Sequence, residues 1–290
     1  MDALDRSRLV VAASAFARPV MPSAALLDAW RQLHYAAQVA SEVGKAWAPP
    51  QADDSHSSFG WQDGCLVGAW APAARRFRAS LRARDLELAL VDEAGTALAR
   101  RALSGSKLDE AMAWVRDAAL RAAGGPARQP AAPAPELPPH PIAAGAPFAL
   151  EPAPFAELAR LLAAANTVLC EVAKPLGAGA VRVWPHHFDM AALAAVEERR
   201  GAATKTLGVG LATPDAIAGA GYWYASPWAA REPASALRWP PLECGRWIER
   251  GAALRMAALP LDELAAAAAG PAALAGFLAD AVAACRASLG

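Results

Sequence analysis

The sequence predicts an α+β protein made of two similar halves, each a helix, a set of antiparallel strands and a second helix. Helical spacing of apolar residues and short strand-like segments recur in the same order on both sides of residues 125–147, and the two leading helices end alike, on Glu42-Val43-Gly44-Lys45 and Glu171-Val172-Ala173-Lys174. Short strands in series between helices favour antiparallel sheets over strict strand–helix alternation. Two such halves can pack as one pseudo-two-fold globule. The alternative is two ordinary domains that share a helix ending.

The first half covers residues 1–124. Its leading helix is predicted from Ala24 to Trp47, because Pro22-Ser23 supplies a start signal, apolar residues recur at helical spacing, and Pro49-Pro50 ends it. Segments rich in strand formers follow, with Glu93-Ala94-Gly95 as a turn. The expected strands are 58–70, 77–83, 86–92 and 97–103, and the expected closing helix is 107–123.

Residues 125–147 are rich in Pro, Ala and Gly, a composition that favours extended, semi-rigid backbone, and we predict a linker there. The second half covers residues 148–290. Its leading helix is expected from Phe155 to Lys174, where Pro175 ends it. The expected strands are 180–192, 206–212, 221–226 and 252–258, and the closing helices are 261–269 and 271–288.

Composition excludes some classes of function. Lys plus Arg and Asp plus Glu number 28 each, so the basic excess that nucleic-acid binders usually carry is missing, and we expect no nucleic-acid partner. One basic cluster alternates with apolar residues and is expected to line the outer face of a sheet; an anionic partner is the alternative. The cluster consists of Arg75, Arg76, Arg78, Arg82 and Arg84.

The four cysteines, Cys65, Cys170, Cys244 and Cys285, lie far apart and form no CxxC pair, which indicates neither a disulfide framework nor a zinc ribbon. A reducing cytoplasm is the expected location. The most apolar late run, 264–279, is broken by Gly270-Pro271 and falls below about 18 uninterrupted residues, so we predict no membrane span.

No P-loop, HExxH, GxSxG or CxxC motif is present. Two polar elements stand out instead, Asp53-Asp54-Ser55-His56 and Trp184-Pro185-His186-His187-Phe188-Asp189, which together hold three of the five histidines. If both run as strands, alternation places Asp54 with His56 on one face and His187 with Asp189 on another.

If the halves pack about a pseudo-two-fold axis, these two pairs can meet and offer two imidazoles and two carboxylates. Such nitrogen and oxygen ligands suit a divalent zinc, iron or manganese ion. The predicted metal ligands are Asp54, His56, His187 and Asp189, with Asp53 as base or supporting residue. The candidate catalytic residues are therefore His187, Asp189 and Asp53.

Two other interpretations stay open. The His-His pair can belong to a partly buried turn whose imidazoles bond backbone carbonyls, with Asp53-Asp54-Ser55 as a solvated turn or cap. Alternatively, His187 and Asp189 form a proton-transfer pair in a metal-free pocket that binds an organic ligand.

Aromatic residues gather in the second half and supply candidate ligand contacts. With a period of two, Tyr222 and Tyr224 project to one side of a strand and Trp223 to the other, so one set can line a pocket while the other packs in the core. We take Tyr222, Tyr224 and Trp228 as the candidate ligand-binding residues.

At these residues the chain resembles a family of uncharacterised bacterial proteins, a domain-of-unknown-function family. The resemblance spans most of the chain and rests on four elements, found here at Pro50–His56, Trp184–Asp189, Gly208–Leu211 and Tyr222–Trp228. This chain has Ala220-Gly221 where relatives tend to have an acidic residue, and Ile248 where they tend to have His. The resemblance implies no activity, cofactor or catalytic residue.

Together these patterns favour an enzyme-like or small-ligand-binding protein with a polar Asp/His site at the junction of the halves. A small molecule is the expected partner, and no membrane partner is expected. The rival hypothesis is a non-catalytic interaction or scaffold protein in which the same residues are structural.

Overall fold

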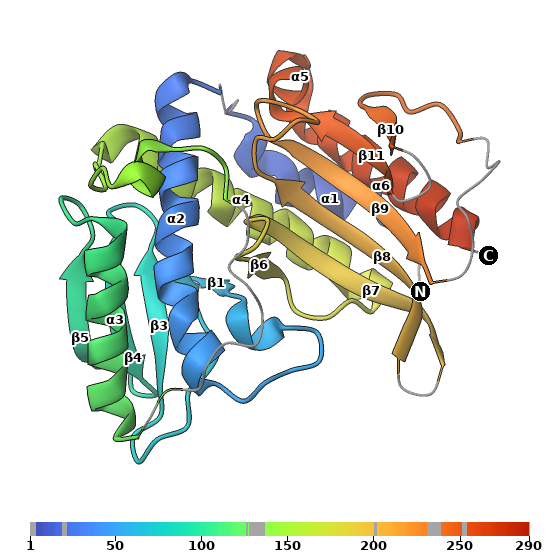
Figure 1. Cartoon of the computed structure of the whole chain (residues 1–290). Helices are drawn as coiled ribbons and strands as arrows, with labels where there is room; N and C mark the ends of the chain where they lie inside the picture. Colours follow the sequence, from blue (N-terminus) through green and yellow to red (C-terminus); the bar gives the residue numbers. More distant parts are fainter. Residues whose placement is uncertain are drawn as a thin grey trace. The chain divides into compact units, whose positions relative to one another are not determined.

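The chain combines helices with two antiparallel β-sheets, which confirms the α+β class (Figure 1). The computed structural model describes residues 4–18, 22–125, 127, 137–199, 202–230, 239–250 and 254–289. The chain divides into two compact units. The N-terminal unit is Ser23–Arg160 with Arg182–Phe188, and the C-terminal unit is Met1–Pro22 with Leu161–Val181 and Asp189–Gly290.

The N-terminal unit is a five-stranded antiparallel meander with two helices side by side on one face (Figure 1). Its strands lie in chain order: β1 (Gly60–Gln62), β2 (Cys65–Val67), β3 (Phe77–Arg82), β4 (Glu87–Asp92) and β5 (Ala97–Ala102). The covering helices are α2 (Ala24–Trp47) and α3 (Leu108–Ala123). The single strand expected at 58–70 is thus two short strands, with Asp63 at φ 49° in the turn between them.

Helix α2 has the predicted bounds. The Ser23 hydroxyl accepts a hydrogen bond from the Leu26 N–H at 3.1 Å, so an otherwise unpaired first-turn donor is satisfied. The helix ends before Pro49, which cannot continue it. Most of its residues are buried, including Trp30 at 1% exposure, so α2 forms the centre of this unit.

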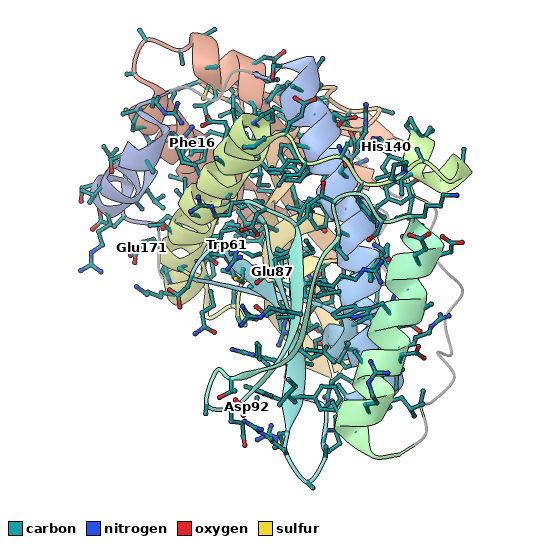
Figure 2. All side chains as sticks on the ribbon, turned by 90° about the vertical axis from the view of Figure 1, so that its left-hand side faces the viewer. Phe16, Trp61, Glu87, Asp92, His140 and Glu171 are labelled. Carbon is teal, nitrogen blue, oxygen red and sulfur yellow. The ribbon has the colours of Figure 1, made fainter. Side chains whose placement is uncertain are left out.

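The last part of the Pro-rich stretch and the residues just after it pack on α2, so the division of the chain differs from the predicted one. The Tyr35 hydroxyl donates to the Pro138 carbonyl at 2.8 Å, and His140 Nε2 lies 3.0 Å from Asp28 Oδ1. The Ala149 N–H donates to Gln32 Oε1 at 2.8 Å. Figure 2 shows His140 beside the helices and Asp92 at the opposite end of this unit. Part of the predicted linker, including η3 (Pro141–Ala144), is therefore structured.

The C-terminal unit holds a second antiparallel sheet, whose strands lie in the order β10-β11-β9-β8-β7. These strands are β7 (Asp189–Arg199), β8 (Ala202–Ala212), β9 (Tyr222–Ala229), β10 (Arg246–Arg250) and β11 (Leu254–Pro260). The helices are α1 (Arg6–Ala12), η1 (Ala13–Phe16), α5 (Leu261–Ala266) and α6 (Gly270–Leu289), and α4 (Pro152–Leu176) spans the division between units.

One face of this sheet packs against helices. Trp223 of β9 is fully buried and meets the Phe16 ring edge-on, with centroids 5.6 Å apart. An ion pair between Arg6 and Asp280 joins α1 to α6. The N-terminal segment, which the sequence assigned to the first half, therefore belongs to the C-terminal unit.

Helix α6 is long and apolar enough to cross a membrane, and half of its apolar window is buried in the structure. Core helices of soluble proteins meet the same criterion. Helix α6 contacts β8, β9 and β11, so here it serves as a core element of the C-terminal unit.

The two-half plan is followed only loosely. Both units contain an antiparallel sheet with helices before and after it, but the first sheet is a plain meander. In the second sheet β11 pairs with β9, while β10 lies at the edge and matches no expected strand.

Two glycines of β8 differ in what surrounds them. A Cβ on Gly210 would lie 2.7 Å from the Met190 carbonyl oxygen and 2.8 Å from the Tyr224 ring, whereas a Cβ on Gly208 would meet nothing closer than 3.8 Å. Gly210 is needed because the Tyr224 ring lies over it. Packing therefore requires glycine at position 210 but not at position 208.

We predict that Gly210→Ala lowers the free energy of unfolding by about 1–3 kcal/mol, because an overpacked core must shift backbone or ring. Gly208→Ala is the matched control and should change it by less than about 0.5 kcal/mol. Urea unfolding followed by circular dichroism measures both. Equal losses in the two variants would show that the Tyr224 contact is not the cause.

Candidate functional site

The Asp53–His56 element is a turn at the end of α2. It forms η2 (Ser55–Ser57), with Asp54 in the left-handed region at φ 56°. Asp53 Oδ1 accepts from the Ser55 N–H at 3.0 Å, and hydrogen bonding to Ser55 lowers the pKa of Asp53. His56 Nδ1 accepts from the Gln51 N–H at 3.2 Å. The expectation that Asp54 and His56 share a strand face is wrong, because these side chains and backbone groups form a capped turn.

The Trp184–Asp189 element is also a turn. Strand β6 (Arg182–Trp184) ends at Trp184, the first residue of the element. Residues 185–188 form a turn, and β7 begins at Asp189. Phe188 adopts φ 55°, and its N–H donates to the Trp184 carbonyl at 2.6 Å. His187 and Asp189 therefore do not lie on one strand face, contrary to the prediction.

Two buried side chains of α2 hold this turn. His34 Nε2 lies 2.9 Å and Gln38 Nε2 lies 2.5 Å from the carbonyl oxygen of Pro185, which accepts both hydrogen bonds. The Phe188 ring stacks on His34, with centroids 5.0 Å apart and planes 11° apart. The turn is thus anchored within the N-terminal unit by one carbonyl and one ring.

Burial is the main cause that lowers the pKa of His34 to about 4, and the nearby His187 and His186 lower it further. His34 is therefore neutral at pH 7, with its proton on Nε2, where it donates to Pro185. His34 and Gln38 were missed from the sequence. The sequence signal that could have found them is two polar residues, four positions apart, on an otherwise apolar helix face. Buried polar side chains in such a position need hydrogen-bond partners.

His186 and His187 are exposed, with ring centroids 4.5 Å apart. Among the residues that the structure describes, no three His, Cys, Asp or Glu side chains are grouped so that they could hold a metal ion. The predicted ligands Asp54, His56, His187 and Asp189 do not form such a group. The prediction of a divalent zinc, iron or manganese ion therefore gains no support from the geometry.

In the C-terminal unit, Asp189 is hydrogen-bonded to Tyr224, not paired with His187 on a strand face as predicted. The Tyr224 hydroxyl donates to Asp189 Oδ2 at 2.6 Å, and the Tyr222 hydroxyl donates to Asp215 Oδ2 at 2.8 Å. Burial is the largest cause that raises the pKa of Tyr224 well above its usual value, and the Asp189 carboxylate adds to it. Tyr224 is therefore a neutral donor that fixes the start of β7 against β9.

The two tyrosines share a sheet face, as predicted, while Trp223 faces the helices. Pairing places other residues on the tyrosine face: Tyr224 is opposite Ala258, which is opposite Arg246, and Tyr222 is opposite Pro260. Trp228 is 51% exposed on the same face. The tyrosine face thus carries polar, aromatic and charged groups.

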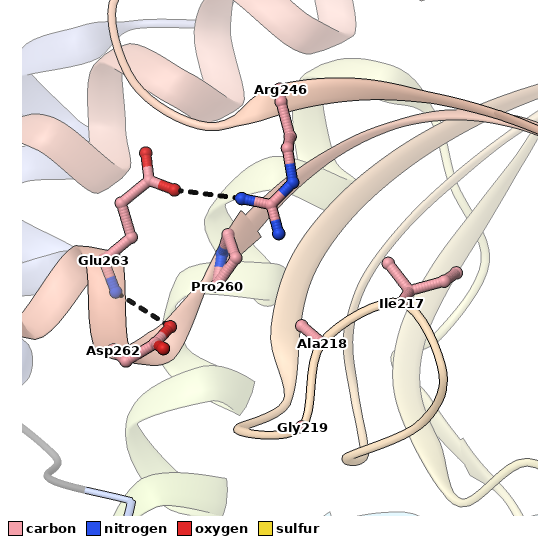
Figure 3. A pocket seen from close by; sticks show the side chains of 7 residues that line it. All are labelled: Ile217, Ala218, Gly219, Arg246, Pro260, Asp262 and Glu263. Atoms are coloured by element: carbon pink, nitrogen blue, oxygen red, sulfur yellow. Dashed lines mark hydrogen bonds and ion pairs between the residues drawn. The ribbon is translucent and has the colours of Figure 1, made fainter.

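A pocket of about 540 Å³ opens on this unit (Figure 3). It is lined by Ile217, Ala218, Gly219, Arg246, Pro260, Asp262 and Glu263. None of the candidate ligand residues Tyr222, Tyr224 and Trp228 lines it. Ile217 and Ala218 pack against the cluster that contains Tyr222, so the pocket adjoins the tyrosine face.

The charged wall of the pocket is held in place by backbone. Glu263 Oε1 accepts from the Gly245 N–H at 2.7 Å, and Glu263 Oε2 lies 3.5 Å from Arg246 Nη1. Gly245 has φ 75°, and a Cβ there would lie 2.6 Å from the Ala258 carbonyl oxygen, so only glycine fits. Asp262 Oδ1 accepts from the Glu263 N–H at 3.0 Å, which orients its carboxylate.

Comparison with known proteins gives no match: no family model fits the chain, and no curated protein or solved structure matches it significantly. The resemblance stated from the sequence stays a prediction.

We predict that acid destabilises the N-terminal unit through His34. The pKa of His34 is about 4 in the folded chain against 6.5 for a free histidine, so between these values the unfolded chain binds a proton that the folded chain does not. Stability is therefore lost as the pH falls from 6.5 to 4, by about 3 kcal/mol in total.

Urea unfolding at several pH values measures this loss. His34→Gln should flatten the profile, because glutamine can donate to Pro185 but does not titrate. Gln38→Ala removes the neighbouring hydrogen bond without a titrating group, so its loss of stability should be the same at pH 4 and pH 7. A steep profile that persists in His34→Gln would refute the assignment.

Proposed function

We propose that the C-terminal unit binds a small zwitterionic molecule in the pocket formed by residues 217–219, 246, 260, 262 and 263. The observation that carries this proposal is the convergence of one guanidinium, Arg246, and two carboxylates, Asp262 and Glu263, on a single pocket. A ligand with one anionic and one cationic group complements both charges.

Size and polarity support a small, polar ligand. The pocket volume of about 540 Å³ falls in the usual range for small-molecule sites, about 300–1,000 Å³. Its walls combine three charged side chains with Pro260 and residues 217–219. A lipid or a fused aromatic ring would leave these charges desolvated and unpaired, which is costly.

Arg246 is suited to the anionic end of the ligand. A guanidinium carries five N–H donors in a planar fork that matches a carboxylate. In the described part of the chain, Arg246 makes one ion pair, to Glu263 at 3.5 Å, which is long for a hydrogen bond. Other donors of the guanidinium therefore remain for a ligand, while Glu263 limits where the group can move.

Asp262 and Glu263 are suited to the cationic end. Each uses one carboxylate oxygen for backbone, Asp262 for its neighbour's N–H and Glu263 for Gly245. A bound ammonium can take the other oxygen of Asp262 and can compete with Arg246 for Glu263. Backbone bonds that fix both carboxylates lower the entropy cost of binding.

This proposal claims binding and no reaction. A small molecule stays the proposed partner. The proposed site is the pocket beside the tyrosine face and not the Asp/His junction. The cytoplasm stays the proposed location, supported by four free thiols that suit a reducing compartment.

We predict that an ω-amino acid binds saturably, whereas its single-charge analogues bind at least about tenfold more weakly, because each lacks one charge-assisted contact. The probes are glycine, β-alanine and 4-aminobutyrate, with butyrate and butylamine as the analogues. Isothermal titration calorimetry measures each affinity, and the best of the three probes reports the spacing of the charges.

Arg246→Gln should weaken the best probe by at least about tenfold, since a hydrogen bond to a charged group contributes about 1.5–3 kcal/mol. Arg8→Gln, an exposed arginine of α1 in the same unit, is the matched control. Butyrate binding as tightly as 4-aminobutyrate, or an unchanged affinity in Arg246→Gln, would contradict the proposal.

A further inference from the structure

On the face of the five-stranded sheet that points away from α2 and α3, one row of side chains that crosses the strands is short. Phe77, Ala79 and Leu81 of β3 are fully buried, or nearly so, on the helix side, so Arg78, Ser80 and Arg82 point to the opposite, outer face. Ser80 pairs with Val67 on one side and Ala89 on the other, and Ala89 pairs with Arg100. The row Val67, Ser80, Ala89 crosses three neighbouring strands on this face, and the next residue in the row is Arg100.

Arginines lie on either side of this row and at its end. Arg78 Nη2 donates to Gln62 Oε1 at 2.9 Å, and its guanidinium lies 4.5 Å from the centre of the Trp70 ring. Arg82, on the other side, is paired with Asp85 at 2.8 Å and Glu87 at 3.2 Å. Arg100 is exposed at the end of the row. The cluster seen in the sequence thus contributes two of these residues to a sheet face, as expected.

Acidic residues interrupt the basic surface. Arg76 pairs with Glu93 at 2.7 Å, and Arg75 pairs with the buried Asp92. Figure 2 shows Glu87 and Asp92 at the two ends of β4; Glu87 lies on the outer face, whereas Asp92 is buried on the same side of the strand as Leu88 and Leu90. Positive charge is therefore concentrated at separate points, chiefly Arg78 and Arg100.

We infer that this outer face is a docking surface for an extended acidic segment of a partner protein, whose carboxylates pair with Arg78 and Arg100 across the Val67–Ser80–Ala89 row. The inference concerns a different unit and surface from the proposed zwitterion pocket, and either can hold without the other.

Charge complementarity selects the occupant. An extended chain spaces alternate side chains about 6–7 Å apart, so it can present carboxylates at chosen points and small residues over the Val67–Ser80–Ala89 row. Arginine is enriched in protein interfaces because its planar fork pairs with carboxylates. A row of small side chains lets a peptide backbone approach the sheet.

A nucleic acid fits this surface less well. A regular phosphate backbone would meet Glu87 and Glu93 as well as the arginines. The Trp70 ring, which could stack on a base, already has the guanidinium groups of Arg76 and Arg78 over it at 5.5 and 4.5 Å. The balance of 28 basic and 28 acidic residues also gives no long-range attraction for a polyanion.

The test uses the full chain and a fluorescein-labelled peptide of alternating Glu and Gly, ten residues long, in a fluorescence anisotropy titration at low salt. We expect saturable binding that weakens as salt is added. The double variant Arg78→Gln/Arg100→Gln should weaken binding by about tenfold. Arg31→Gln/Arg121→Gln, with the same loss of charge on the exposed sides of α2 and α3, should change it by less than about twofold.

Circular dichroism melting checks that the variants fold. If the double variant does not, Arg100→Gln alone, an exposed position, should still weaken binding by about threefold. Equal weakening by the control pair would overturn the inference, as would the absence of binding below about 1 mM peptide. Tighter binding of a ten-nucleotide oligothymidylate than of the peptide, lost in the same double variant, would assign the face to nucleic acid and overturn it too.

Discussion

Helix α2 is buried on nearly all sides, and the N-terminal unit depends on how its buried polar groups are satisfied. A buried donor or acceptor without a partner costs about 1–3 kcal/mol, so the hydrogen bonds that other segments make to the buried polar side chains of α2 stabilise this unit. Its buried polar residues are Gln32, His34, Gln38, Ser41 and Glu42. Gln32 bonds the backbone of Ala149, His34 and Gln38 bond Pro185, and Glu42 accepts from Arg116 at 2.9 Å. One helix therefore positions α3, the segment 138–149 and the Trp-Pro-His-His turn.

The C-terminal unit follows a different constraint, the two-sided nature of a β-sheet. Trp223 and its neighbours face the helices and form an apolar core, whereas the tyrosine face keeps its hydroxyl groups paired with carboxylates. Register then carries Arg246 and Pro260 onto this second face. The pocket needs no dedicated motif. It arises where the end of β11, the start of α5 and the loop at 217–219 meet.

Local signals predicted elements well where the local chain decides the structure. Ser23 and Pro49 set the ends of α2, and the alternation along β3 set which residues face the core. Prediction failed where distant contacts decide. Read as a strand, residues 184–189 place His187 and Asp189 on one face, but Pro185 lacks an N–H, Phe188 takes a positive φ, and two side chains of α2 fix the turn. The pocket joins three segments far apart in sequence, so no single pattern could have predicted it.

The contrast between the two polar regions shows how a distinctive motif can serve folding. The Trp-Pro-His-His-Phe-Asp element has the composition of a site, yet its Pro185 carbonyl accepts two buried donors, its Phe188 ring covers His34, and its Asp189 accepts from Tyr224. Groups whose hydrogen bonds are already made within the protein have little left to offer a ligand. Arg246, Asp262 and Glu263 belong to stretches of sequence without a recognisable motif, but each is partly exposed. Each is oriented by a backbone N–H or by an ion pair within the group, and each has donor or acceptor atoms available for a ligand. The physical reason to place binding at the pocket is therefore that its charged groups can still form hydrogen bonds and ion pairs with a ligand, not that its sequence is distinctive.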